Sequence, residues 1–162
     1  MSQEKFPITP AIRFLRAHSI LFTPHLYPYE ERGGTAHSAR CLGVDEHDVI
    51  KTLIMEDERK QPLIVLMQGD RQVSTQALAR QLRVRSITPC DPAVAHKHSG
   101  YLIGGTSPFG TRKVMPVYLE ASILDRPHIY INGGKRGFLV GMRSADLQRL
   151  LQPTRVQVAT GA

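Results

Sequence analysis

Two apolar stretches separated by a short charged segment constrain the fold of this chain more than any other feature. Residues 49–56 (VIKTLIME) and residues 62–70 (PLIVLMQGD) have the length and the β-branched, apolar content typical of strands. The segment that joins them, EDERKQ, has the charged composition of a turn. We therefore predict a β-hairpin. Apolar residues on both faces of its first strand indicate that both faces are buried.

Shorter elements are predicted around this hairpin. Helices are expected to begin at five capping signals: Thr9-Pro10, Thr35, Ser74, Asp91-Pro92 and Ser144. Further strands are expected over residues 20–27, 84–88, 114–119, 128–132, 138–142 and 154–158. Many strands with short helices between them favour one α+β domain with a mixed or barrel-like sheet over a doubly wound sheet.

The length of 162 residues fits a single domain, which we expect to span residues 1–162 and to bury a core without metal or disulfide. Two cysteines, Cys41 and Cys90, cannot form a disulfide framework and are typical of reduced cytosolic thiols. No apolar run approaches the roughly 20 residues that cross a bilayer, and the N-terminus lacks the pattern of a signal peptide. We therefore expect a soluble, cytoplasmic protein without a membrane partner.

Charge is distributed unevenly along the chain. Residues 1–70 carry 8 basic and 10 acidic side chains, whereas residues 71–162 carry 13 basic and 4 acidic ones, a net charge of +9. Most of the cations are arginines, whose planar guanidinium suits phosphate. One interpretation is a basic face for a polyanion, with nucleic acid as the first candidate. The other is a basic surface that only keeps the protein soluble.

Lys51 stands out because it lies within an apolar strand, where lysine is seldom buried without a partner. A half-buried ammonium can polarise a carbonyl, bind an anion or act as a base if its pKa falls. The structural alternative is a lysine on an edge strand, with its stem packed and its charge in water.

Two glycine-rich segments are candidate binding loops. Residues 104–110 (GGTSPFG) allow backbone amides to converge on an oxygen or a phosphate, although they match no nucleotide-binding fingerprint. Residues 133–137 (GGKRG) place two cations at a turn, where they can hold a phosphate or a terminal adenosine. A wide surface turn and a solvated hairpin tip are the respective structural alternatives.

No metal site or activated nucleophile is evident in the sequence. His96 and His98 form the only close histidine pair, and two positions apart on a helix their side chains point in different directions. Cys41 is expected on an apolar helical face, and Cys90 precedes Asp-Pro. Nothing near either thiol marks an activating histidine, so we expect both to be structural.

Taken together, these segments resemble the YbaK/EbsC family, the free-standing relatives of the editing domain inserted in bacterial prolyl-tRNA synthetases. The resemblance covers about residues 8–151. It rests on ITPAIRFL at the start, IKTLI around Lys51, GYLIGGTSPFG at residues 100–110 and YINGGKRG at residues 130–137. It implies an α+β domain with a mixed, curved, barrel-like central sheet surrounded by short helices.

The resemblance further implies a trans-editing aminoacyl-tRNA deacylase, which hydrolyses the ester of a mischarged tRNA. The expected substrate is Cys-tRNA(Pro) or another small amino acid on tRNA(Pro), attacked by water or by the thiol of a cysteinyl group. The implied catalytic residues are Lys51 and Gly104. Substrate contacts are expected from Tyr27, Thr52, Gly105, Thr106, Ser107, Gly134, Lys135 and Arg136.

The family uses neither metal nor cofactor, and the implied partners are the tRNA acceptor end and prolyl-tRNA synthetase. Arg80, Arg83 and Arg85 become candidates for contacts with the RNA backbone. The chain departs from the family where loops line the amino-acid end of the pocket, with PYEERGGTAHSA after Tyr27 and FLV after GGKRG. Two alternatives stay open: a catalytically silent module that binds tRNA or a synthetase, and a hydrolase of small esters or amides.

Overall fold

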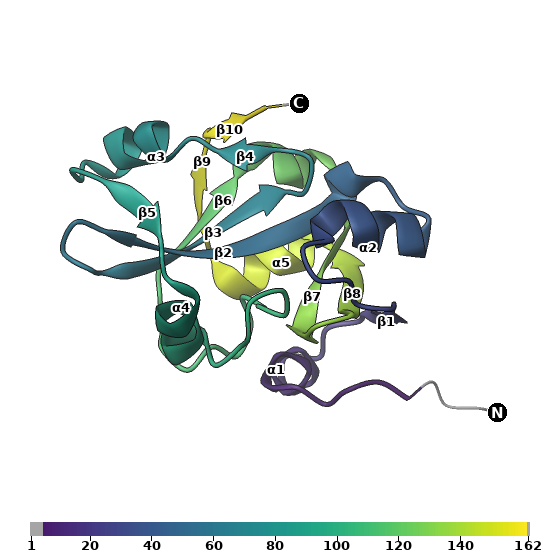
Figure 1. Cartoon of the computed structure of the whole chain (residues 1–162). Helices are drawn as coiled ribbons and strands as arrows, with labels where there is room; N and C mark the ends of the chain where they lie inside the picture. Colours follow the sequence, from purple (N-terminus) through teal and green to yellow (C-terminus); the bar gives the residue numbers. More distant parts are fainter. Residues whose placement is uncertain (1–4, 162) are drawn as a thin grey trace.

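The predicted hairpin is the centre of the molecule. The computed structural model describes residues 5–161, and in it β2 (Val49–Asp57) and β3 (Pro62–Gln68) pair in antiparallel register from Ile50 opposite Gln68 to Glu56 opposite Pro62. All seven residues of β3 are buried, as expected for a strand covered on both faces. Figure 1 shows the two strands crossing the middle of the domain.

The hairpin belongs to a mixed sheet in the order β1-β8-β7-β2-β3-β6-β9, with β5 paired to β2 beside this path. The pairs β2–β7, β3–β6 and β6–β9 are parallel, and the others are antiparallel. In this order β1 and β9 are the edges, and the sheet does not close. The remaining strands are β1 (Thr23–Leu26), β5 (Ile87–Pro89), β6 (Val117–Glu120), β7 (His128–Lys135), β8 (Phe138–Arg143) and β9 (Thr154–Val156), with β4 (Gln72–Val73) and β10 (Ala159–Thr160) forming a separate pair.

Short helices cover both faces of the sheet, which confirms the predicted α+β class. They are α1 (Pro10–Ala17), α2 (Gly34–Leu42), α3 (Thr75–Leu82), α4 (Pro92–Ser99) and α5 (Ser144–Leu151), with 3₁₀ turns η1 (Glu46–Asp48) and η2 (Ala121–Asp125). No helix among residues 5–161 is long and apolar enough to cross a membrane.

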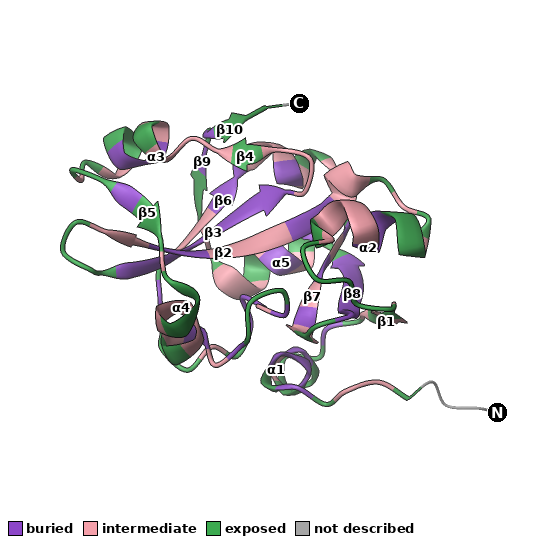
Figure 2. Ribbon diagram, viewed as in Figure 1, coloured by how far each residue is buried: buried purple, intermediate pink, exposed green. Residues whose placement is uncertain are grey.

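The core lies on the two sides of the sheet, which Figure 2 shows as a buried central band. On one side, Ile50 and Ile54 of β2 join a cluster with residues of α1 and α5. On the other side, Met55 joins a cluster with α3, and Val49 joins one with α2. Because side chains alternate along a strand, Lys51 lies on the same side as Val49 and Met55, between α2 and α3.

Several predicted boundaries shift. The caps at Thr9 and Ser74 are confirmed, since each hydroxyl accepts a hydrogen bond from the first turn of its helix. Thr35 does not cap α2, which begins at Gly34, because its hydroxyl donates to Glu46 instead. Ser144 is the first residue of α5 rather than its cap. The expected strands at 20–27 and 84–88 shorten to β1 and β5.

A gap in the sheet positions the site described below. β2 and β7 are neighbours only where Val49 and Ile50 lie opposite Tyr130 and Ile131. β5 reaches β2 only from Met55 onward. Between these pairings, no strand of the described chain adjoins residues 51–53 on that edge.

Candidate active site

A cavity of about 800 Å³ opens beside residues 51–53 of β2. Its walls come from β2, from α2 and the segment that precedes it, from the glycine segment after α4, and from β7 and the start of β8. Six of the ten predicted site residues line it: Tyr27, Lys51, Thr52, Gly104, Thr106 and Arg136. Segments that are far apart in the sequence therefore meet at one site.

Lys51 is half-buried in this wall. Burial lowers the pKa of its ammonium group, while the carboxylates of Glu46 and Asp70 oppose that shift. The ammonium makes no hydrogen bond or ion pair with any residue from 5 to 161. It is therefore a poorly solvated cation that is free to contact a ligand in the cavity.

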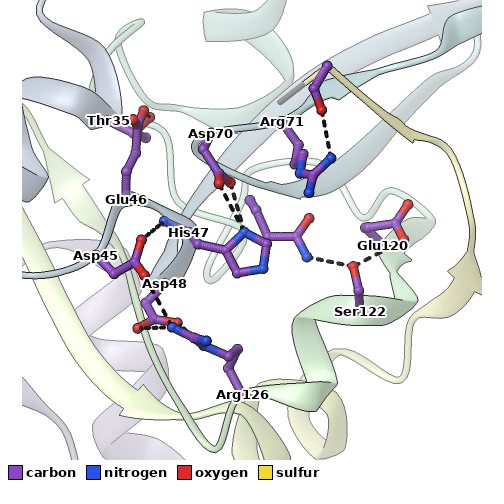
Figure 3. Close-up of polar contacts among 12 residues, drawn as sticks. Thr35, Asp45, Glu46, His47, Asp48, Asp70, Arg71, Glu120, Ser122 and Arg126 are labelled. Atoms are coloured by element: carbon purple, nitrogen blue, oxygen red, sulfur yellow. Dashed lines mark hydrogen bonds and ion pairs between the residues drawn. The ribbon is translucent and has the colours of Figure 1, made fainter.

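The carboxylates near Lys51 are held by other partners (Figure 3). Glu46 accepts a hydrogen bond of 2.7 Å from the Thr35 hydroxyl, and Asp70 lies 2.9 Å from Nδ1 of His47. Asp45 and Asp48, on either side of Glu46 and His47, form ion pairs with Arg126. These contacts hold an acidic cluster, which we define as the carboxylates of Asp45, Glu46, Asp48 and Asp70. The cluster does not line the cavity, which is lined instead by Glu30 and Glu31.

Thr52 presents a second unsatisfied group. Its hydroxyl oxygen is buried and has no hydrogen-bond partner in the described part of the chain, although the residue lines the cavity. A buried hydroxyl without a partner carries a free-energy cost.

The glycine segment approaches Lys51 from the opposite side of the gap. Gly104 has a φ of +84°, and a Cβ there would lie 2.8 Å from the Tyr29 hydroxyl, so only glycine fits. The Gly105 amide is occupied, since it donates to the Leu102 carbonyl at 2.9 Å. The Gly104 amide has no partner within residues 5–161, which leaves a backbone donor at the cavity.

Four predicted residues do not line the cavity, and three of them, Gly105, Ser107 and Gly134, pack within the loops beside it. A Cβ on Gly105 would lie 2.7 Å from the backbone nitrogen of Arg136, so this glycine permits close approach of the two loops. The buried Ser107 hydroxyl accepts from the Phe109 amide. Gly134 packs against Tyr101, while Lys135 is exposed beside a neighbouring groove.

Asn132 joins the two glycine loops, a role that the sequence analysis missed. Its Nδ2 donates to the Gly104 carbonyl at 3.1 Å. Its Oδ1 accepts from the amides of Gly134 (2.7 Å) and Lys135 (3.1 Å). An asparagine directly before Gly-Gly is a common turn residue, so only its position next to GGKRG could have signalled this role.

Arg136 strengthens the same junction. Its Nε donates to the Ile103 carbonyl at 2.8 Å, and its guanidinium lies 5.3 Å from the centre of the Tyr29 ring. The side chain thus ties the glycine segment to the β7–β8 turn while it lines the cavity. A contact between Arg136 and the substrate remains a prediction.

The α2 side of the cavity contains Tyr27, Ser38 and His37. Burial raises the pKa of the Tyr27 phenol, and its ring packs edge-on against His37. The imidazole of His37 lies 3.0 Å from Glu30 and 2.7 Å from the Pro28 carbonyl. Neither His37 nor Ser38 was singled out from the sequence, because nothing there relates α2 to Lys51.

The expectation for Cys41 was wrong. It is exposed rather than on an apolar face, because α2 buries Ser38 and Ala39 instead. Its sulfur lies 3.6 Å from Nε2 of His37, but the thiol does not line the cavity. Cys90 is partly buried, and burial with the nearby Glu56 raises its pKa to about 11. Within residues 5–161, no group of three or more His, Cys, Asp or Glu side chains is arranged to hold a metal ion.

The chain is similar in sequence to known proteins. A protein of Enterococcus faecalis, EbsC, described as a candidate Cys-tRNA(Pro)/Cys-tRNA(Cys) deacylase, is 23% identical over 153 residues, covering 94% of this chain and 93% of its own. A proline–tRNA ligase of Thermodesulfovibrio yellowstonii is 22% identical, and the match covers 96% of this chain but only 27% of that enzyme.

Solved structures share the fold. A candidate trans-editing enzyme for prolyl-tRNA synthetase superposes with a TM-score of 0.81 at 18% identity, covering 96% of this chain and all of that one. A hypothetical protein, APE2540, gives 0.85 at 18% identity, covering 94% of this chain and all of that one. Residues 30–150 match the aminoacyl-tRNA editing domain, and they include β2 and both glycine loops. The chain belongs to the aminoacyl-tRNA editing domain family.

Proposed function

We propose that this protein is an aminoacyl-tRNA deacylase that acts in trans on mischarged tRNA. The observation that carries the proposal is the pairing of two unpartnered groups at one cavity. Lys51 and Gly104 both line it, and neither the Lys51 ammonium nor the Gly104 amide has a hydrogen-bond partner within residues 5–161. Family membership makes the ester between an amino acid and the tRNA 3′ adenosine the natural substrate for such a site.

The two groups have complementary roles in ester hydrolysis. A backbone amide aimed at the carbonyl oxygen stabilises the oxyanion that develops as the tetrahedral intermediate forms. Lys51 is placed to orient the aminoacyl ester or a phosphate of the terminal nucleotide by charge. The attacking group is water or, for a cysteinyl ester, the substrate's own thiol. The carbonyl–oxygen bond then breaks, and the ribose hydroxyl leaves.

The proposed substrate is a small amino acid on tRNA(Pro), with cysteine first because EbsC is described as acting on it. The α2 wall would contact the amino-acid side chain, since Tyr27, His37 and Ser38 line that side of the cavity. Prolyl-tRNA synthetase is the proposed partner. We place the protein in the cytoplasm, where charged tRNA is used.

The test is a panel of tRNA(Pro) charged with cysteine, alanine, serine or threonine, incubated with purified protein. The expected result is loss of the esterified amino acid from at least one of them, at a rate proportional to enzyme concentration. Prolyl-tRNA(Pro) serves as the matched control and should stay charged. Absence of turnover on all four mischarged tRNAs would reject the proposal.

A silent binding module is the alternative that the same panel separates. Such a module would bind tRNA or synthetase yet leave every ester intact. A hydrolase of small esters is separated by including free aminoacyl methyl esters, which that alternative predicts to be the better substrates. The Gly104 amide, which has no partner within residues 5–161, favours catalysis over the silent module, because a module that only binds RNA has no use for an oxyanion donor.

A further inference from the structure

Three segments of the chain contain no aspartate or glutamate. Residues 5–29, 92–119 and 127–145 hold nine lysines and arginines between them, and every one of these cations is exposed. All Asp and Glu side chains of the described chain lie in the other segments. Arg143 lies opposite His128, at the other end of the β7–β8 pair from Lys135. We call the other eight residues the cationic face: Lys5, Arg13, Arg16, Lys97, Arg112, Lys113, Lys135 and Arg136.

The fold brings these segments together. The Phe14 and Phe109 rings stack with centroids 5.8 Å apart, joining α1 to the glycine segment. The Thr9 hydroxyl donates to the Gly133 carbonyl, which joins the start of α1 to β7. In Figure 1, α1, α4 and the turn between β7 and β8 lie in the lower part of the view, whereas α3 lies at the top.

None of the nine cations forms an ion pair with a described carboxylate. Elsewhere, Arg126 pairs with Asp45 and Asp48, and Arg149 pairs with Asp146. Residues of the cationic face therefore retain their full charge for an external partner, apart from screening by salt. A cluster of unpaired cations without any intervening carboxylate attracts a polyanion.

A shallow groove connects this face to the cavity. It is lined by Lys5 and Lys135 and by the segment 26–28, and it shares Tyr27 and Arg136 with the cavity. Two members of the acidic cluster, Glu46 and Asp70, act on the Lys51 charge, and no member of the cluster lines the groove. The groove is lined by the cations Lys5, Lys135 and Arg136 and by no carboxylate of the described chain, whereas Glu30 and Glu31 line the α2 side of the cavity. A phosphate chain that leaves the cavity along the groove therefore meets only cations.

We infer that the groove and the cationic face bind the phosphate backbone of the RNA acceptor end that carries the esterified adenosine. This inference rests on the proposed function and adds the direction in which the tRNA leaves the site. Phosphate contacts supply affinity and orientation without reading sequence. The tRNA body would thus lie over α1 and the glycine segment rather than over α2.

The test measures binding of fluorescently labelled, uncharged tRNA(Pro) to the full chain over a range of salt concentrations. The groove variant Lys5→Gln/Lys135→Gln should bind more weakly and reduce the slope of log K against log salt by about 2, roughly one for each phosphate contact. The matched control, Arg59→Gln/Arg155→Gln, removes two exposed charges outside the cationic face and should keep the wild-type slope. Equal slopes for the groove variant and the wild type would overturn the inference.

A second comparison locates the surface. The variant Arg80→Gln/Arg85→Gln removes two charges on and just after α3. If it lost tRNA binding while the groove variant bound tRNA like the wild type, the RNA would lie on the α3 side and the inference would be overturned. Kinetics separate this failure from failure of the proposed function. The single variant Lys5→Gln should raise KM for charged tRNA but leave hydrolysis of aminoacyl-adenosine unchanged, because Lys5 lines the groove and not the cavity. A wild type that hydrolyses no substrate would instead refute the proposed function.

Discussion

Asn132 offers the sharpest test of how the site is held together. The Asn132→Ala substitution removes three hydrogen bonds, one to the Gly104 carbonyl and two from the amides of Gly134 and Lys135. Each is worth about 0.5–1.5 kcal/mol net, and Asn132 is partly exposed, so we expect a loss of about 2 kcal/mol in the free energy of unfolding. For a chain of this size, that loss lowers Tm by roughly 4–8 °C.

The matched variant Asn132→Asp separates stability from positioning. A carboxylate still accepts from the Gly134 and Lys135 amides, but it cannot donate to Gly104. Asn132→Asp should therefore lose only about 1 kcal/mol of stability. Both variants release the Gly104 carbonyl, and a shift of about 1 Å in a catalytic loop can lower kcat by about 100-fold.

The assays are thermal unfolding and single-turnover deacylation of the best mischarged tRNA from the panel. We expect both variants to lose kcat, whereas only Asn132→Ala shows the large fall in Tm. An Asn132→Asp protein with wild-type kcat would refute the claim that this side chain positions Gly104.

Three further predictions concern the loop, the thiols and the charge of Lys51. Gly105→Ala should lower deacylase activity, because the added Cβ would clash with the backbone of the β7–β8 turn. The control Gly43→Ala, with no atom within 4 Å of the added Cβ, should lose stability but keep activity. Equal activities of the two variants would contradict this prediction. Ellman's reagent at pH 8 should modify exposed Cys41 quickly and Cys90 slowly, because the Cys90 pKa is raised to about 11; equal rates would count against it. Because burial lowers the Lys51 pKa, the enzyme-catalysed rate should fall as pH rises through a value below 10.5, and Lys51→Arg should lack this fall; identical profiles would exclude a role for the ammonium.

Local chemistry explains what could be predicted from the sequence. Lys51 was recognisable because burying a cation within an apolar strand costs free energy unless a partner or a ligand compensates for it. The strand pair β2–β3 followed from two apolar runs and the turn between them. The glycine loops followed from residues that tolerate conformations other residues avoid, as the φ of +84° at Gly104 confirms.

Non-local pairing explains what could not be predicted. The gap between β2 and β7 depends on where two distant strands stop pairing, and no local pattern encodes that point. The roles of Asn132 and His37 depend on loops that meet only in the folded chain. The cationic face was also not predicted. Counting charges separately before and after residue 70 places Lys5, Arg13 and Arg16 in the part of the chain with a net negative charge.

The most direct test of the central claim is the rate at which Lys51→Ala deacylates the best mischarged tRNA(Pro), measured under single-turnover conditions beside the wild type. Lys51 contacts no described side chain through its ammonium, so the variant should fold normally and bind uncharged tRNA. We predict a fall in the rate of at least about 100-fold, in the range expected when a group that acts on the transition state is removed. A Lys51→Ala protein that deacylates at the wild-type rate would contradict the account.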